Sequence, residues 1–520
     1  MTPPNPFDIQ NLKTYSRPTL PIIAIARALA WLAAIVTFLN VLFFVLRASD
    51  PVISSDSWYF LDVFVSKAIK GDLGITDFFV KRHGLDHAQP LEKLLLLVEL
   101  RFFDLDPVIE ALAGVFGAAT CALALYHLVK IVRRDKCSEI TSYLAWATMC
   151  AILFSLNSTG VWTWPIVASG YVTLIPILIF MWSTWNAWRS QRYLLMAAAT
   201  IFLGIVDDDN AIIAVAATLT ALLVVAVCES RQQRGHLWGI LAVVVTCMAM
   251  VRLGYAHAPV IGKTTNAPEP LAVHLRALLD LARRGDGWKW ITIPLMLSVL
   301  PAKPLGGISS QTWLAIEVVA TILLLISNAL FWRKAFRGPY NLTKYIAVCL
   351  MVLSYGWIIS IILYRVSQLG SNYLYQDRYV LIYQFDVIAL LLMWAVTCES
   401  EITLQRWHQR LRQWVPAFCC ITLLAIQIPL SLNAWHSRRY LISYYHEMAV
   451  QLENLANDPT QATDCLPELA VCKQPLDRRR ALLQLLRGNH LDVFSSRVQK
   501  WHPFLPQWGE ARENAASAVH

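Results

Sequence analysis

The sequence predicts an all-α polytopic integral membrane protein with about eleven transmembrane helices, and three observations support this prediction. Of its 520 residues, 57% are hydrophobic and only 15% are charged, unlike an average soluble domain. Runs of roughly twenty apolar residues recur along most of the chain, which is the length an α-helix needs to cross a bilayer. These runs do not alternate between apolar and polar residues, so a transmembrane barrel is disfavoured.

Basic residues set the expected orientation. Lys13, Arg17 and Arg27 precede the first apolar run, 28–46, and the positive-inside rule therefore places the N-terminus in the cytoplasm. This run is too long for a signal-peptide core and is expected to remain as an anchor. Lys and Arg gather in every second short loop, which explains the net charge of +9 without nucleic-acid binding. The expected location is a bacterial inner membrane, with the C-terminus on the periplasmic side.

Further spans are expected between residues 108 and 435. Seven of them are expected at 108–132, 140–156, 193–206, 312–332, 345–366, 380–397 and 415–435. Three more are expected to end near Trp188, Cys228 and Tyr255. The apolar stretch 288–300 is short for a crossing, and a crossing there would put Arg333 and Lys334 on the outside. This stretch is therefore expected to be interfacial or re-entrant.

The expected domains are a transmembrane domain, 1–435, and a small helical periplasmic tail, 436–520. Two long periplasmic loops, 47–107 and 256–311, interrupt the transmembrane domain. In the tail, Cys465 and Cys472 lie close together in a polar segment. A disulfide between them is expected in an oxidising compartment, and two free thiols are the alternative.

The first loop is far longer than a turn between two spans needs to be, which indicates a site rather than a connector. Trp58, Leu61 and Val65 recur at helical spacing and predict a helix lying in the membrane interface. A second such helix is expected at 91–103. Carboxylates, imidazoles and cations lie between the two: Asp72, Asp77, Lys81, Arg82, His83, Asp86 and His87.

This mixture suits a reaction of a lipid-linked phosphate donor at the membrane surface. Asp56 or Asp86, the latter beside His87, is a candidate to take a proton from an acceptor hydroxyl. Arg82 is a candidate to neutralise the phosphate that leaves. As alternatives, Asp56 is an N-cap of the Trp58 helix and Asp86 is an ordinary acid of a solvated loop.

Arg378 and Tyr379 lie at the expected outer mouth of the span 380–397. A cation on this side is unusual under the positive-inside rule, and Arg378 is therefore a candidate phosphate ligand. An ion pair with Asp377 or with a lipid phosphate is the alternative. Arg283 and Arg284, in the second loop, either help to hold a phosphate or are simply solvated.

Three consecutive acids, Asp207, Asp208 and Asp209, lie where a short span meets the outer surface. Like charges repel, and Mg²⁺ or Mn²⁺ would relieve the repulsion through oxygen ligands. Alternatively, Asp209 or its neighbour caps the next span. Trp58 is a candidate substrate contact. Trp162 and Trp164, with Tyr171, are candidates to stack on a sugar ring, with anchoring at the interface as the alternative.

Four short motifs resemble those of a known family. They are Asp56-Ser57-Trp58, Asp86-His87-Ala88, Arg378-Tyr379 and Leu491-Asp492-Val493-Phe494. With the early loop and the number of spans, they are similar to the type C (GT-C) glycosyltransferases, and to bacterial membrane proteins of that build that show Asp-x-Trp, Glu-His-Arg, Arg-Tyr and Leu-Asn-Val-Phe. The chain departs from this pattern at two positions: Asp86 stands where those proteins have glutamate, and Ala88 stands where they have arginine. Arg82 is a candidate to take over the role of that arginine.

The resemblance implies that a sugar moves from a polyprenyl-phosphate donor to a cell-envelope glycan or lipid, such as lipopolysaccharide, at the periplasmic face. It implies inversion at the anomeric carbon without a covalent intermediate. The alternatives are a transporter or flippase of lipid-linked sugars, an O-antigen polymerase or ligase, and a non-catalytic membrane partner protein. The chain has no Walker A sequence and no Gly-rich dinucleotide loop, which disfavours a pump driven by ATP.

Overall fold

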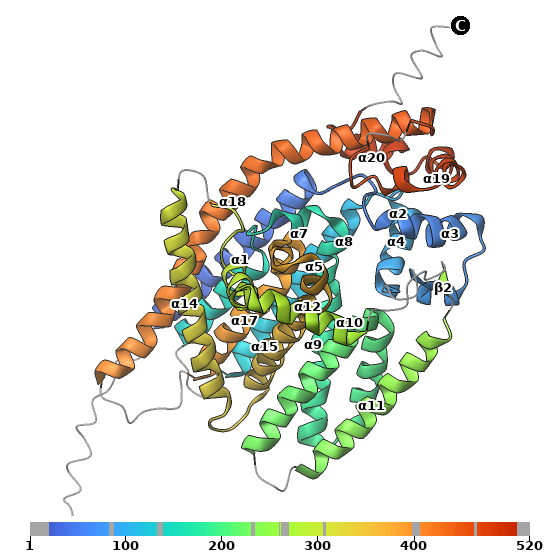
Figure 1. Ribbon diagram of the computed structural model, residues 1–520. Helices are drawn as coiled ribbons and strands as arrows, with labels where there is room; N and C mark the ends of the chain where they lie inside the picture. Colours follow the sequence, from blue (N-terminus) through green and yellow to red (C-terminus); the bar gives the residue numbers. More distant parts are fainter. Residues whose placement is uncertain are drawn as a thin grey trace, which may run out of the picture.

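The computed structural model (Figure 1) describes residues 20–82, 88–132, 139–229, 234–258, 260–261, 270–304, 308–397, 406–461 and 465–506. In these residues the regular structure is helical, apart from one short parallel pair of strands. The pair joins β1 (Lys81–Arg82) to β2 (Val260–Ile261). It therefore connects the first long loop with the second.

Nine helices of the described part are long and apolar enough to cross a membrane, so the protein is a multi-pass α-helical membrane protein. They are α1 (Leu20–Ala48), α5 (Val108–Val132), α9 (Gly170–Ser190), the second half of α10 (Tyr193–Cys228), α11 (Arg234–Ala256), α14 (Ser310–Ala335), α15 (Leu342–Ile361), α17 (Val380–Thr397) and α18 (Arg406–Asn457). The shorter α6 (Glu139–Leu153) and the first half of α10 would raise the number to about eleven. That total stays a prediction.

α10 is a hairpin. It begins directly after α9, and Glu229, which follows its last residue, accepts hydrogen bonds from Arg189 at 2.9 Å and Trp188 at 3.2 Å near the end of α9. Both ends of α10 therefore lie at the same end of the bundle. Asp208 makes the turn between the two arms, with φ 46° and ψ −116°. The turn falls where the three acids predicted the end of a span.

The long loops gather at one end of the bundle, which we call the loop face. Three hydrogen bonds join segments far apart in the sequence: the Asp50 N–H donates to the Thr163 carbonyl (3.0 Å), Ser158 Oγ to the Asp377 carbonyl (3.3 Å) and Asn157 Nδ2 to the Leu297 carbonyl (2.7 Å). The short elements of the loop face are α7 (Thr159–Thr163), α8 (Pro165–Ala168), α12 (Leu271–Arg283), η6 (Asp286–Trp288), α13 (Lys289–Leu297), η7 (Ile362–Val366), α16 (Ser367–Leu369), η8 (Ser371–Tyr375) and η9 (Asp377–Tyr379).

The first loop and the tail share a hydrophobic cluster of their own. In the first loop, α2 (Ser57–Phe60), η2 (Leu61–Val65), α3 (Ser66–Lys70), η3 (Ile75–Phe79) and α4 (Pro90–Phe102) follow one another, and in the tail η10 (Ala470–Lys473), α19 (Leu476–Gly488), η11 (Asp492–Phe494) and α20 (Ser496–Trp501). Figure 1 shows α19 and α20 beside α2 and α4. The predicted helix around Trp58 is present, but Trp58, Leu61 and Val65 are buried in the hydrophobic cluster that the first loop, including α4, shares with the tail. The side that was expected to face the membrane is therefore covered by this cluster.

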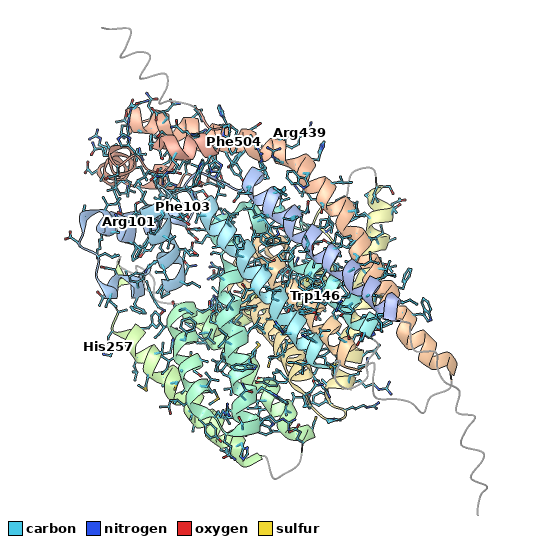
Figure 2. The ribbon with its side chains drawn as sticks, turned by 180° about the vertical axis from the view of Figure 1, so that it is seen from behind. Arg101, Phe103, Trp146, His257, Arg439 and Phe504 are labelled. Carbon is cyan, nitrogen blue, oxygen red and sulfur yellow. A yellow bond between two sulfur atoms is a disulfide. The ribbon has the colours of Figure 1, made fainter. Side chains whose placement is uncertain are left out.

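Polar contacts hold this junction as well. Arg478 of α19 forms an ion pair with Asp62, and the Asp492 carboxylate accepts a hydrogen bond from the Ile53 N–H at 3.3 Å. Figure 2 shows the junction from behind, with Phe103 and Phe504 on it. The same view shows Trp146 within the bundle, where its indole N–H donates to a carbonyl of α5 at 2.9 Å.

The structure refines two of the predicted segments. The helix that carries the last predicted span continues unbroken beyond residue 435, because α18 extends to Asn457 and so forms the first part of the tail. The stretch 288–300 contains α13, a helix of nine residues whose second half is buried in the bundle core. Nine residues are too few to cross a bilayer, which agrees with an interfacial or re-entrant placement.

Candidate functional site

Arg378 of η9 lies inside a group of aromatic rings at the loop face. The centre of its guanidinium is 5.2 Å from the ring centroid of Tyr379, 5.6 Å from that of Tyr373 and 5.8 Å from that of Trp164. These contacts are cation–π interactions, and Arg378 also donates a hydrogen bond to the Tyr373 hydroxyl. We call these four residues the Arg378 cage.

Two donors of the cage lack acceptors. Arg378 Nε and Trp164 Nε1 are both buried, and neither has a hydrogen-bond partner among the described residues. A buried donor without a partner costs about 1–3 kcal/mol, so an acceptor from outside the chain would be favoured here. A phosphate oxygen is the acceptor that an arginine recognises best.

The cage is held in place by a close approach of two loops. A Cβ atom on Gly160 of α7 would lie 2.6 Å from Cβ of Asp377, so only glycine fits there. The Asp377 carboxylate lies against Gly160 and Ser158, and the ion pairs found in the described residues do not join it to Arg378. The ion pair between Arg378 and Asp377, which was an alternative role for Arg378, is therefore not formed.

Asp208 is the centre of a second charged group. Its carboxylate is 3.0 Å from Arg252, 3.5 Å from Lys81 and 2.7 Å from the N–H of Ala88, and the residue is 1% exposed. These contacts bind the first loop to the α10 turn and to α11. Ala88, in the position where the resembling proteins have arginine, is itself fully buried.

Asp208 is already paired at the place where the sequence suggested a metal site. Two cations and one N–H donor already compensate Asp208, while Asp207 accepts a hydrogen bond from Asn210 at 3.4 Å. No cluster of three or more metal-binding side chains is found in the described part of the chain. The side chain of Asp209 lies outside that part. Ion pairs therefore relieve the charge of Asp208, and a metal at the three acids stays a prediction.

Asp56 lies at the edge of the first loop, next to the tail. It is exposed and occupies the N-cap position of α2, but its side chain makes no capping hydrogen bond. The preceding residue, Ser55, donates its N–H to the Glu468 carbonyl of the tail at 2.7 Å. Asp86 and His87 lie outside the described residues, as does the side chain of Arg82. That Asp86, His87 and Arg82 meet Arg378 at one site stays a prediction.

Trp58 and Trp162 are placed in packing rather than at an open surface. Trp58 is 1% exposed within the cluster shared with the tail. Trp162 is fully buried, stacks on Tyr171 with ring centroids 4.8 Å apart, and donates its indole N–H to the Ser155 carbonyl. Neither ring offers a face on which a sugar could stack.

The sequence analysis missed several buried acids. Burial raises the pKa of Asp50 to about 7, against the lowering effect of a hydrogen bond from the Val52 N–H, and Glu468 raises it further. Burial also raises the pKa of Glu92 and, more strongly, that of Glu99 on α4. The place of Asp50 directly after the first span was a usable signal in the sequence. The approach of α4 to α5 had no such signal.

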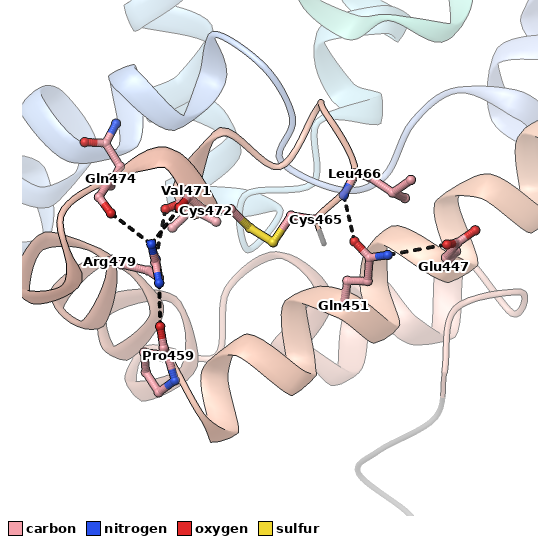
Figure 3. Close-up of a disulfide and its surroundings, with 9 residues drawn as sticks. All are labelled: Glu447, Gln451, Pro459, Cys465, Leu466, Val471, Cys472, Gln474 and Arg479. Carbon is pink, nitrogen blue, oxygen red and sulfur yellow. Dashed lines mark hydrogen bonds between the residues drawn. A yellow bond between two sulfur atoms is a disulfide. The ribbon is translucent and has the colours of Figure 1, made fainter. Parts of the chain in front are cut away.

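The tail contains the expected disulfide. Cys465 and Cys472 are bonded, with their Cα atoms 6.4 Å apart (Figure 3). Arg479 supports the bridged segment through four carbonyls: Pro459 at 2.6 Å, Cys472 at 2.6 Å, Gln474 at 3.1 Å and Val471 at 3.4 Å. The bridged segment includes Glu468, so the disulfide lies next to the contact with Ser55.

Comparisons with known proteins give no relative: no family model, no curated protein and no solved structure matches the chain. The likeness to GT-C glycosyltransferases therefore depends on the four motifs, and the function is argued from the loop face alone.

Proposed function

We propose that the protein is a GT-C-type glycosyltransferase of a bacterial inner membrane, with its loop face on the periplasmic side. It would transfer a sugar from a polyprenyl-phosphate donor to a cell-envelope glycan or lipid. The observation that carries the proposal is the Arg378 cage, in which two buried donors without partners lie on the face where the long loops meet. A phosphate at the membrane surface would satisfy both donors.

The chemistry is a single displacement. The acceptor hydroxyl oxygen attacks the anomeric carbon, and the bond from that carbon to the phosphate oxygen breaks. The hydroxyl proton goes to Asp56 or Asp86 as general base, and the lipid phosphate leaves with one more negative charge. Arg378, and Arg82 if it reaches the same place, would stabilise that charge. His87 would act through Asp86.

One observation favours a second candidate, a transporter of lipid-linked sugars. Asp386 lies inside the span α17, is 2% exposed, and accepts a hydrogen bond from Asn328 of α14 at 3.1 Å. Tyr355 in turn donates to Asn328 at 2.5 Å. Acids inside a membrane are often part of transport pathways, and this buried network is the feature that a transporter predicts. It lies within the spans, whereas the Arg378 cage lies at the loop face.

The test uses membranes that contain the full chain, a labelled polyprenyl-phosphate sugar and a lipid acceptor. We expect Arg378→Ala to lower the transfer rate by about a hundredfold or more, and Trp164→Phe, which removes only the indole donor, by about tenfold. Arg480→Ala removes an exposed cation from the tail and should leave the rate unchanged. Size-exclusion profiles would show that each variant remains folded.

One further result tests the assigned base, and another decides between the two candidate functions. If both Asp56→Asn and Asp86→Asn transfer sugar at the wild-type rate, the assignment of the base is wrong. If the intact donor crosses the bilayer and no sugar is transferred, the transporter replaces the glycosyltransferase.

A further inference from the structure

The helix α12 of the second loop has an apolar stripe that the protein leaves uncovered. His274 and Leu278 face the protein and are buried, whereas Leu271, Leu275 and Leu279 are 53%, 47% and 57% exposed. Residues four apart lie on one face of a helix, so these three leucines form one continuous stripe. The exposed stripe runs beside the buried one along the length of the helix.

The polar side of α12 carries arginines and one acid, Asp280, which pairs with Arg283 at 3.4 Å. Arg276 and Arg283 are exposed and lie next to the apolar stripe, and Arg284 follows at the end of the helix. Exposed Trp288 and Ile291 extend the apolar surface beyond the helix, at 62% and 56% exposure. An apolar stripe bordered by arginines and followed by an exposed tryptophan is the arrangement of a helix that lies in a membrane interface.

α12 and α13 are fastened to the segment that carries the cage. His274 of α12 forms a hydrogen bond with Ser367 of α16 at 2.8 Å, and Trp290 of α13 donates its indole N–H to Ser371 of η8 at 3.0 Å. Tyr373, a member of the Arg378 cage, belongs to the same η8. The depth at which α12 lies in the membrane would therefore be passed on to one wall of the cage.

We propose that α12 is an in-plane membrane anchor that docks on the anionic surface of the outer leaflet and holds the Arg378 cage at the depth of the lipid phosphates. Leu271, Leu275 and Leu279 would enter the acyl-chain boundary, while the arginines bind headgroup phosphates. Charge complementarity selects this occupant over a second protein, since a lipid surface offers both an apolar layer and a layer of negative charge. The consequence for the donor phosphate rests on the proposed function, but the docking itself does not.

The test places a photoreactive benzophenone side chain at single positions of the full-length protein in vesicles. Positions 275 and 279 lie on the apolar stripe, and positions 276 and 280 on the polar side serve as matched controls. We expect several-fold more lipid adduct from the first two positions than from the controls in vesicles of phosphatidylcholine with phosphatidylglycerol. Equal yields at the four positions, or adducts to protein only, would overturn the proposal.

A second comparison tests the role of charge. Adduct yield at position 279 should rise when phosphatidylglycerol is added to phosphatidylcholine vesicles, and the double substitution Arg283→Gln/Arg284→Gln should abolish that rise. A rise that survives the double substitution would contradict the assignment of these arginines. No sugar transfer is needed for either readout, so a failure of the proposed activity and a failure of the membrane anchor are distinguishable.

Discussion

Asp50 shows how burial changes the chemistry of a single residue at the loop face. It follows the first span, is 6% exposed, and has a pKa raised to about 7, chiefly by burial. The charge of Glu468 in the tail contributes to the raised pKa of Asp50, and the charge of Asp50 contributes to the raised pKa of Asp492. The sequence analysis chose Asp56 instead, because an exposed acid beside a helical repeat resembles a catalytic loop, and it did not use the place of Asp50 directly after the first span.

The raised pKa of Asp50 predicts that the tail docks less firmly as pH rises. A pKa of about 7 in the docked state, against 3.8 in water, means that docking is fully supported below about pH 4 and weakens as pH rises through 7. The difference amounts to at most about 4 kcal/mol. Hydrogen exchange of residues 465–506, corrected for intrinsic rates, should be slower at about pH 5 than at about pH 8.

Two substitutions check the cause. Asp50→Asn keeps an acceptor for the Val52 N–H and should remove the pH dependence, whereas Asp56→Asn, at an exposed acid nearby, should retain it. If the tail of the Asp50→Asn protein still loosens as pH rises, another group is responsible.

At the scale of single elements, the sequence predicted what depends on local pattern. Apolar runs located the spans, such as α5 and α17, because length and hydropathy suffice to define a crossing. The continuation of α18 beyond residue 435 could not be read in this way, since the helix becomes polar while its backbone stays regular. The partner of the Trp58 helix was also missed. An apolar stripe on a helix indicates that another surface covers it, but it does not identify that surface.

The α10 turn combines backbone strain with charge. The φ and ψ angles of Asp208, 46° and −116°, are close to the first central position of a type II′ turn, which favours glycine. The ion pairs of this carboxylate with Arg252 and Lys81 offset the cost of the strained backbone.

Replacing Asp208 should therefore destabilise the α10 hairpin. Asp208→Asn removes the buried charge and should lower stability by about 3 kcal/mol, seen as a lower midpoint temperature of the detergent-solubilised protein. Asp208→Ala should be less stable than Asp208→Gly by about 1 kcal/mol, since alanine is strained at positive φ. Asp72→Asn, at an exposed acid of the first loop, should have no effect. Equal midpoints for Asp208→Asn and the wild type would show that the ion pairs contribute nothing.

For the whole molecule, two hydrophobic clusters are the main organising feature. The larger one lies within the bundle, and the smaller one joins the first loop to the tail. No sequence pattern could pair residues around 58 with residues around 490, because contacts between distant segments depend on the complete fold. The sequence alone predicted no contact for the motif Leu491-Asp492-Val493-Phe494. The structure places Asp492 against Ile53 of the first loop.

This division predicts that the loop–tail cluster can open while the bundle stays folded. The disulfide closes a short loop, because its cysteines are seven positions apart in sequence, and such a link is worth about 2–3 kcal/mol. In the Cys465→Ser/Cys472→Ser double variant the segment that holds Glu468 loses this constraint, and its hydrogen bond from Ser55 should weaken. Limited proteolysis should then cleave the tail several-fold faster, with the bundle fragments still protected.

Cys419→Ser is the matched control, since Cys419 is a free, exposed cysteine on α18, and its tail should be cleaved at the wild-type rate. A reductant should accelerate cleavage of the wild-type tail to the rate of the double variant, because the two treatments remove the same link. Should the double variant resist cleavage as well as the wild type, the apolar contacts and the Arg478–Asp62 ion pair hold the tail without help from the disulfide. Should the bundle be cleaved together with the tail, the two clusters unfold as one unit.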